Sequence, residues 1–254
     1  MKIQVFSDLH FEAHSEFDIP ETEAEVIVLA GDINEGLGGV EWALRQSKRL
    51  SKPVLYVFGN HEHYQNSFPG LMTQAHMLAL GSDVHILERN RFIHGNTRFL
   101  GCTLWSDFHL FGSERANECR EFARLNMPDY LIVVKQNGEL LQPEDTLWIF
   151  DQSLKWLQRE LDRPWPGKTV VVTHHAPSNL SNNPKYADDL LTAAFISNLD
   201  HIIKCHRIDA WIHGHTHFNV DFHIRKTRII THQRGYPGEE LPGNPFSRSQ
   251  VFKL

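Results

Sequence analysis

Five short apolar segments of the chain are each followed directly by a group of polar residues. The apolar residues run continuously, as they do in strands that are buried on both faces of a parallel sheet. The stretches that separate the first three segments are long enough for helical crossovers, and residues 40–50 have the apolar spacing of a helix. The pattern therefore predicts an α/β fold with a largely parallel sheet. The five segments are residues 3–6, 26–30, 54–58, 168–173 and 210–212.

Other parts of the chain add further expected elements. Helical spacing of apolar residues predicts three more helices, at residues 67–80, 146–161 and 191–203. Shorter alternating segments predict antiparallel strands at residues 84–87, 91–94 and 97–103. No internal repeat and no linker-like stretch interrupts the sequence. We therefore expect a single domain over residues 1–254.

The polar groups that follow the five apolar segments share one chemistry. Ligand sites in open α/β sheets lie beyond the carboxyl ends of the strands, so groups far apart in sequence are expected to meet there. Carboxylate, imidazole and amide oxygen ligands suit Mn, Fe, Zn or Co ions. Each group alone also fits an ordinary turn, and it is the ordered set that indicates a metal site. The groups are Asp8-Leu9-His10, Gly31-Asp32, Gly59-Asn60-His61-Glu62, His174-His175 and Gly214-His215-Thr216-His217.

This ordered pattern resembles that of the calcineurin-like metallophosphoesterases, and it spans residues 8–217. The resemblance implies a four-layer αββα sandwich with two metal ions at the C-terminal ends of the strands. It implies that Asp32 bridges the two metals. Asp8, His10 and His217 would complete the first site, and Asn60, His174 and His215 the second. Either His174 or His175 supplies the histidine ligand after its strand, and we favour His174 because it follows the strand directly.

The resemblance assigns no metal to one residue of the motifs, His61. We expect His61 to stabilise the phosphoryl oxygen or to protonate the leaving group. The family more often has Asp at the next position, where this chain has Glu62, and we expect this carboxylate to orient His61. Two metals that share Asp32 and a hydroxide would support in-line attack on phosphorus. No protein nucleophile is required.

The expected activity is hydrolysis of a phosphodiester or phosphomonoester, with a small molecule as substrate and two Mn, Fe or Zn ions as cofactors. Three alternatives remain: a protein phosphatase, a mononuclear zinc hydrolase, and a metal-binding scaffold without catalysis. The formal net charge of −6 argues against broad binding to nucleic acid or to anionic membranes. The sequence does not identify the substrate-binding residues.

The cysteines and the N-terminal segment bear on location. Cys102, Cys119 and Cys205 are far apart and odd in number, which fits reduced thiols better than a disulfide framework. The first ten residues do not have the composition of a signal peptide, and no apolar stretch is long enough for a membrane span. We therefore expect a cytoplasmic protein.

Overall fold

The computed structural model describes residues 1–239, 241 and 243–254, and within these ranges the chain forms two main β-sheets. The strand order is β13-β1-β2-β3-β5 in the first sheet and β11-β12-β10-β9-β7-β6 in the second. The strands of the first sheet are β1 (Lys2–Phe6), β2 (Val26–Ala30), β3 (Val54–Val57), β5 (Val84–Ile86) and β13 (Phe252–Lys253). Those of the second are β6 (Asn90–His94), β7 (Thr97–Cys102), β9 (Lys168–Thr173), β10 (Ala210–His213), β11 (Asp221–Ile224) and β12 (Thr227–Thr231). The short strands β4 (Ser67–Phe68) and β8 (Val134–Lys135) pair separately.

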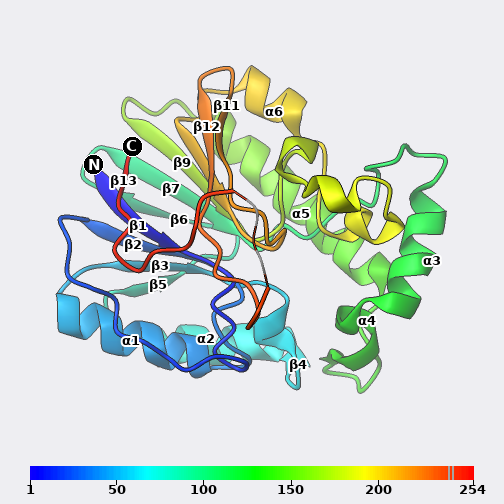
Figure 1. The fold of residues 1–254 in the computed structure, drawn as a ribbon, viewed down its shortest axis with the longest axis horizontal. Coiled ribbons are helices and arrows are strands. Elements are labelled where there is room, and N and C mark those ends of the chain that lie inside the picture. The colour runs from blue at the N-terminus through cyan, green and yellow to red at the C-terminus, as the bar shows by residue number, and fades with distance from the viewer. Residues whose placement is uncertain (240, 242) are drawn as a thin grey trace.

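The first sheet is parallel except at one edge. β1, β2, β3 and β5 pair in parallel, and β13 is antiparallel to β1. The connecting helices α1 (Gly38–Leu50) and α2 (Gly70–Ala79) cover its outer face (Figure 1). The prediction of an antiparallel strand at residues 84–87 is wrong, because α2 carries the chain back across the sheet and β5 joins β3 in parallel.

The second sheet has a parallel centre and two antiparallel edges. β7, β9, β10 and β12 pair in parallel, and β6 and β11 are antiparallel to β7 and β12. Its outer face packs against α3 (Ala116–Asn126), α5 (Pro143–Asp162) and α6 (Asp200–Cys205), and the short helix α4 (Pro128–Ile132) follows α3. The predicted helix at residues 146–161 is therefore confirmed as the central part of α5.

The two sheets stack face to face, and alternation along each strand divides their side chains between three cores. Val170 and Val172 of β9 face the other sheet, where they pack in one cluster with Val5 of β1 and Val28 of β2. Val171, between them in sequence, faces the helices on the outer side. A third cluster joins the first sheet to α1 and α2. The predicted four-layer αββα sandwich is thus confirmed.

The predicted helix at residues 191–203 is wrong as a single element. The chain forms a 3₁₀ helix at Leu190–Ala194 and then α6 from Asp200. Between them the backbone pairs with Ala176, which donates to the carbonyl of Phe195 and accepts from the amide of Ser197. This pairing uses backbone groups that a continuous helix would need for itself.

The carboxyl ends of β1, β2, β3, β9 and β10 lie on the same side of the sandwich, where loops from both sheets meet (Figure 1). No helix within the described ranges is long and apolar enough to cross a membrane.

Candidate metal centre

The polar residues that follow the five strands come together in space. The ligand atoms of Asp8, His10 and His217 all lie within 4.8 Å of one another. Those of Asp32, His174 and His215 do the same. A third group, formed by His10, Asp32 and His61, lies within the same distance limit and connects the first two, since it shares His10 with one and Asp32 with the other. The arrangement therefore has the form of two adjacent ligand sets with Asp32 between them.

The first set joins the loop after β1 to the segment after β10. Nε2 of His10 lies 3.2 Å from Nε2 of His217, which in turn lies 3.4 Å from Oδ1 of Asp8. Each histidine has a carboxylate at its other ring nitrogen: Nδ1 of His10 donates to Glu12 (2.7 Å), and Nδ1 of His217 donates to Glu239 (2.6 Å). These bonds fix the ring orientation and leave Nε2 free to face the centre.

The second set is built around the His174 ring. Its Nδ1 donates to the carbonyl of Ala30 (2.8 Å), so its Nε2 faces the other predicted ligands. That atom lies 3.1 Å from Oδ1 of Asn60, 3.1 Å from Nδ1 of His215 and 3.3 Å from Oδ2 of Asp32.

The neighbouring histidine, His175, lies outside this set. Its Nδ1 is directed to the carbonyl of Thr103 at 3.3 Å, and its ring packs between Trp105 and His215. Its position thus differs from that of His174, whose ring reaches the cluster.

Two residues on the side away from the ligand cluster orient the side-chain amide of Asn60. Its Nδ2 donates to Oδ1 of Asp129 (2.8 Å) and to the hydroxyl of Tyr64 (3.0 Å). The Tyr64 hydroxyl itself donates to the same carboxylate oxygen at 2.6 Å. Because both donors of the amide point away from the centre, its oxygen points toward His174.

Much of the backbone at the site is in the left-handed conformation, which residues other than glycine rarely adopt. Five of the seven predicted ligands have a left-handed backbone, with φ between 44° and 69°. Local hydrogen bonds hold it: the amide of His215 donates to Oδ1 of Asp8 (3.0 Å), and the amide of His217 donates to Gln233 (2.8 Å). Such strain collects where the fold holds side chains in a functional position. The five residues are Asp8, His10, Asp32, His215 and His217.

Two motif glycines are required by close packing. A Cβ atom at Gly59 would overlap Oδ1 of Asp32 and the ring of His174. A Cβ atom at Gly214 would overlap the side chains of Ser7 and Asp8. The glycines therefore let the backbone approach the ligands.

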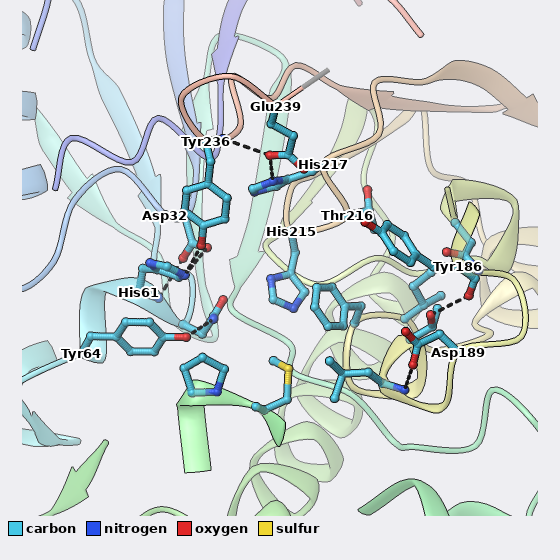
Figure 2. A pocket seen from close by; sticks show the side chains of 18 residues that line it. Asp32, His61, Tyr64, Tyr186, Asp189, His215, Thr216, His217, Tyr236 and Glu239 are labelled. Atoms are coloured by element: carbon cyan, nitrogen blue, oxygen red, sulfur yellow. Dashed lines mark hydrogen bonds and ion pairs between the residues drawn. The ribbon is translucent and has the colours of Figure 1, made fainter. Parts of the chain in front are cut away.

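His61 faces the same centre but has different partners. Its Nδ1 lies 3.0 Å from Oε1 of Glu12, and its Nε2 lies 3.0 Å from the hydroxyl of Tyr236 and 4.0 Å from Oδ2 of Asp32. Figure 2 shows His61 beside Asp32 and Tyr236. Burial opposes protonation of His61, but the charge of Asp32 and the Glu12 carboxylate outweigh it and raise its pKa to about 9. These two carboxylates therefore favour the protonated form of the ring.

Glu62 does not contact the His61 side chain, which corrects the expectation that it orients this residue. Its buried carboxylate accepts hydrogen bonds from the amides of Asp32 (3.1 Å), Ile33 (2.8 Å) and Gly59 (2.6 Å), and from the Tyr56 hydroxyl (2.7 Å). The carboxylate next to His61 is that of Glu12. Glu62 instead ties together the loops that follow β2 and β3.

The electrostatics of the cluster favour bound positive charge. Burial opposes protonation of His174 and His217, but the nearby Asp32 and Asp8 carboxylates outweigh it, so the pKa values rise to about 9 and about 10. Burial also opposes ionisation of Asp32, yet the histidines around it hold its pKa well below the usual range. Ring nitrogens that face each other at 3.1–3.2 Å suit a shared cation better than a mutual hydrogen bond. The residues therefore fit metal ions.

A cavity of about 340 Å³ opens directly onto these residues. Asp32, His61, His215 and His217 form one part of its wall (Figure 2). The opposite part comes from residues 127–128 and from the segment 182–196. The cavity gives a small molecule access to both ligand sets.

Sequence reasoning missed the residues that support the ligands. Glu12 lies two positions after His10, and this spacing was the only feature of the sequence that pointed to a contact between the two side chains. Asp129 and Glu239 lie in segments without a motif, and only the fold brings them to Asn60 and His217.

Comparisons with known proteins identify the family of the chain and agree with its fold. The model of the calcineurin-like phosphoesterase family matches residues 1–219. An uncharacterized protein of Acanthamoeba polyphaga mimivirus is 25% identical over 99% of this chain and 97% of its own length. The phosphopantetheinyl hydrolase of Mycobacterium tuberculosis has a similar structure, with a TM-score of 0.71 at 17% identity over 93% of this chain and 90% of its own. A dimetal phosphatase from Danio rerio has a TM-score of 0.55 at 15% identity, over 91% and 86%. The chain belongs to the calcineurin-like phosphoesterase family.

Proposed function

We propose that the protein hydrolyses small phosphate esters at a dinuclear metal centre, by in-line attack of water on phosphorus. The observation that carries this proposal is the pair of adjacent ligand sets, one of Asp8, His10 and His217 and one of Asp32, His174 and His215, in which Asp32 also lies within 4.8 Å of His10. A mononuclear site would use only one of the sets. The family of the chain is one of metal-dependent phosphoesterases, which supports the same class of reaction.

In this proposal two ions of Mn, Fe or Zn would bind, with Asp32 as a ligand common to both. Asp8, His10 and His217 would hold the first ion, and Asn60, His174 and His215 would hold the second. The bound metals supply Lewis acidity for the phosphoryl oxygens and an activated water as the nucleophile. The chain orients three of these ligands through carboxylates behind them: Glu12 holds His10, Glu239 holds His217 and Asp129 holds Asn60.

His61 serves as the proton donor in the proposed reaction. It lines the cavity, and its Nε2 lies 3.0 Å from the Tyr236 hydroxyl, which also lines the cavity. The Glu12 carboxylate at Nδ1 keeps the ring oriented and protonated. When the ester bond breaks, His61 donates this proton to the leaving oxygen and accepts one back from solvent.

The cavity supports a small-molecule substrate over a protein. Its volume of about 340 Å³ is at the lower end of the range for small-ligand sites. The M. tuberculosis protein of similar structure is named for hydrolysis of a phosphopantetheinyl group, which is also compatible with a small ester. Protein phosphatase activity and a scaffold role without catalysis have no comparable observation in their favour.

The test is hydrolysis of p-nitrophenyl phosphate and bis-p-nitrophenyl phosphate by metal-stripped protein to which Mn²⁺ is returned. We expect metal-dependent release of nitrophenol, and the preferred ester distinguishes a monoesterase from a diesterase. Asp32→Asn should abolish release, while Asp151→Asn, at an exposed position on α5, should not. Equal release with and without metal, or full activity of Asp32→Asn, would refute the proposal.

A further inference from the structure

The cavity beside the candidate metal centre has two ends of different chemistry. One end carries the candidate ligands and His61. The other is lined mainly by aromatic and aliphatic side chains, with Asn182, Asp189 and Thr192 as its polar members. Phe195 joins the two ends, because its ring stacks on that of His215 at a centroid distance of 4.2 Å and an angle of 24°. A group attached to a phosphoryl bound near His215 would therefore meet an apolar wall first. Met127, Pro128 and Leu191 continue this wall.

Among the described residues, this wall offers no lysine or arginine to a second anionic group. Neither Lys nor Arg is among the described side chains that line the cavity, whereas Asp189 and Glu239 are. Glu239 is paired with His217, and Asp189 accepts from the amide of Leu191. Lys185 lies nearby, with Nζ 5.1 Å from the centre of the Tyr186 ring, but it is not part of the lining. A second phosphate or a carboxylate at this end would face Asp189, apolar groups and the neutral side chains of Asn182, Tyr186 and Thr192, with no cation to compensate its charge among these residues.

From these features we infer the substrate class, on the basis of the function proposed above. The site takes small esters with a single phosphoryl group and an uncharged aromatic or aliphatic leaving group. It discriminates against substrates that carry a further anionic group, such as nucleoside diphosphates or polyphosphorylated sugars. Burial of the leaving group against the apolar wall favours the first class, and uncompensated negative charge disfavours the second.

Binding of non-hydrolysable phosphonates tests this inference without requiring catalysis. The dissociation constants of 4-methylbenzylphosphonate and 4-(carboxymethyl)benzylphosphonate are measured by calorimetry on the Mn²⁺-loaded protein. These ligands share the phosphonate and the ring and differ in one negative charge. We expect the carboxylate to weaken binding by at least about tenfold. Equal or tighter binding of the carboxylate, or no binding of either ligand, would overturn the inference.

A cation placed in the wall should reverse the preference. Leu191→Lys should reduce the difference between the two ligands to less than about threefold, while Leu191→Met should keep it. If Leu191→Lys does not fold, Tyr186→Arg offers the same test at an exposed lining position. A preference that survives both charged variants would contradict the assignment to this wall.

The outcomes separate the two proposals. Ester hydrolysis without discrimination between the phosphonates would overturn the inferred substrate class and leave the proposed hydrolysis standing. Discrimination between the phosphonates without hydrolysis of any ester would overturn the proposed function and leave the binding preference standing.

Discussion

The buried carboxylate of Asp129 accepts a hydrogen bond of 2.8 Å from Nδ2 of Asn60, across 69 positions of sequence. This bond directs the amide oxygen of Asn60 toward His174 and so prepares it as a ligand. Asp129 lies at the start of α4, outside the motifs of the site.

Removing this acceptor should weaken metal binding. In Asp129→Leu the Asn60 amide loses its preferred orientation, and we expect the dissociation constant of the more weakly held metal to rise by about tenfold or more. Chelator competition with Mn²⁺ measures the change. Asp129→Asn should restore most of the affinity, because its amide oxygen can still accept. Asp151→Leu on the surface of α5 serves as the matched control, and equal metal affinity of Asp129→Leu and the control would contradict the role.

Glu62 should contribute to stability more than to proton transfer. Its carboxylate accepts from three backbone amides and from Tyr56, and Glu62→Gln would place amide hydrogens against some of these donors. We expect the free energy of unfolding of the metal-free protein to fall by about 2–4 kcal/mol. Urea denaturation at pH 8 measures it, with the exposed Glu21→Gln as control. A loss below about 0.5 kcal/mol would show that these bonds do not hold the loops together.

His61→Ala should separate metal binding from turnover. Because the residue faces the cavity and is not one of the seven proposed ligands, we expect full Mn²⁺ occupancy and a decrease in kcat of about 100-fold or more. Steady-state kinetics and metal analysis of the same preparation provide the two values. His223→Ala, at an exposed position in β11, should leave both unchanged. Normal turnover of His61→Ala at full occupancy would remove the assigned role.

His63 should make the stability of the metal-free protein depend on pH. Burial lowers its pKa from 6.5 to about 4 in the folded protein. The unfolded chain therefore takes up a proton first, and the stability that comes from the neutral ring is complete above pH 6.5 and is lost as the pH falls toward 4.

The loss through His63 amounts to about 2 kcal/mol between pH 8 and pH 5. Urea denaturation of the wild type and of His63→Leu at both pH values isolates this contribution, because the other titrating groups are common to both. We expect the wild type to lose about 2 kcal/mol more than the variant. Parallel losses in the two proteins would show that His63 is protonated in the folded state.

The strands that carry the site were predictable from sequence because their apolar runs are unambiguous. The segments before Asp8, Asp32 and His174 are buried on both faces, and such runs have few alternative structures. The parallel pairing of β5 was not predictable, since three residues hold no information on the direction of their partner. The broken helix at residues 191–203 depends on pairing with Ala176, a contact between distant segments.

From the sequence, only those site residues that belong to the motifs could be predicted. The spacing of Asp8 and His10 indicates two ligands on one side of the chain, whereas the support from Glu239 and Asp129 depends on tertiary contacts. Glu62 shows the limit within a motif: its position next to His61 suggested a contact that the turn after β3 directs elsewhere.

The most direct test of the dinuclear centre is anomalous diffraction from crystals of the protein loaded with Mn²⁺. We predict two peaks on either side of Asp32, one bounded by Asp8, His10 and His217 and the other by Asn60, His174 and His215. A single peak at full occupancy, or peaks away from Asp32, would contradict the account.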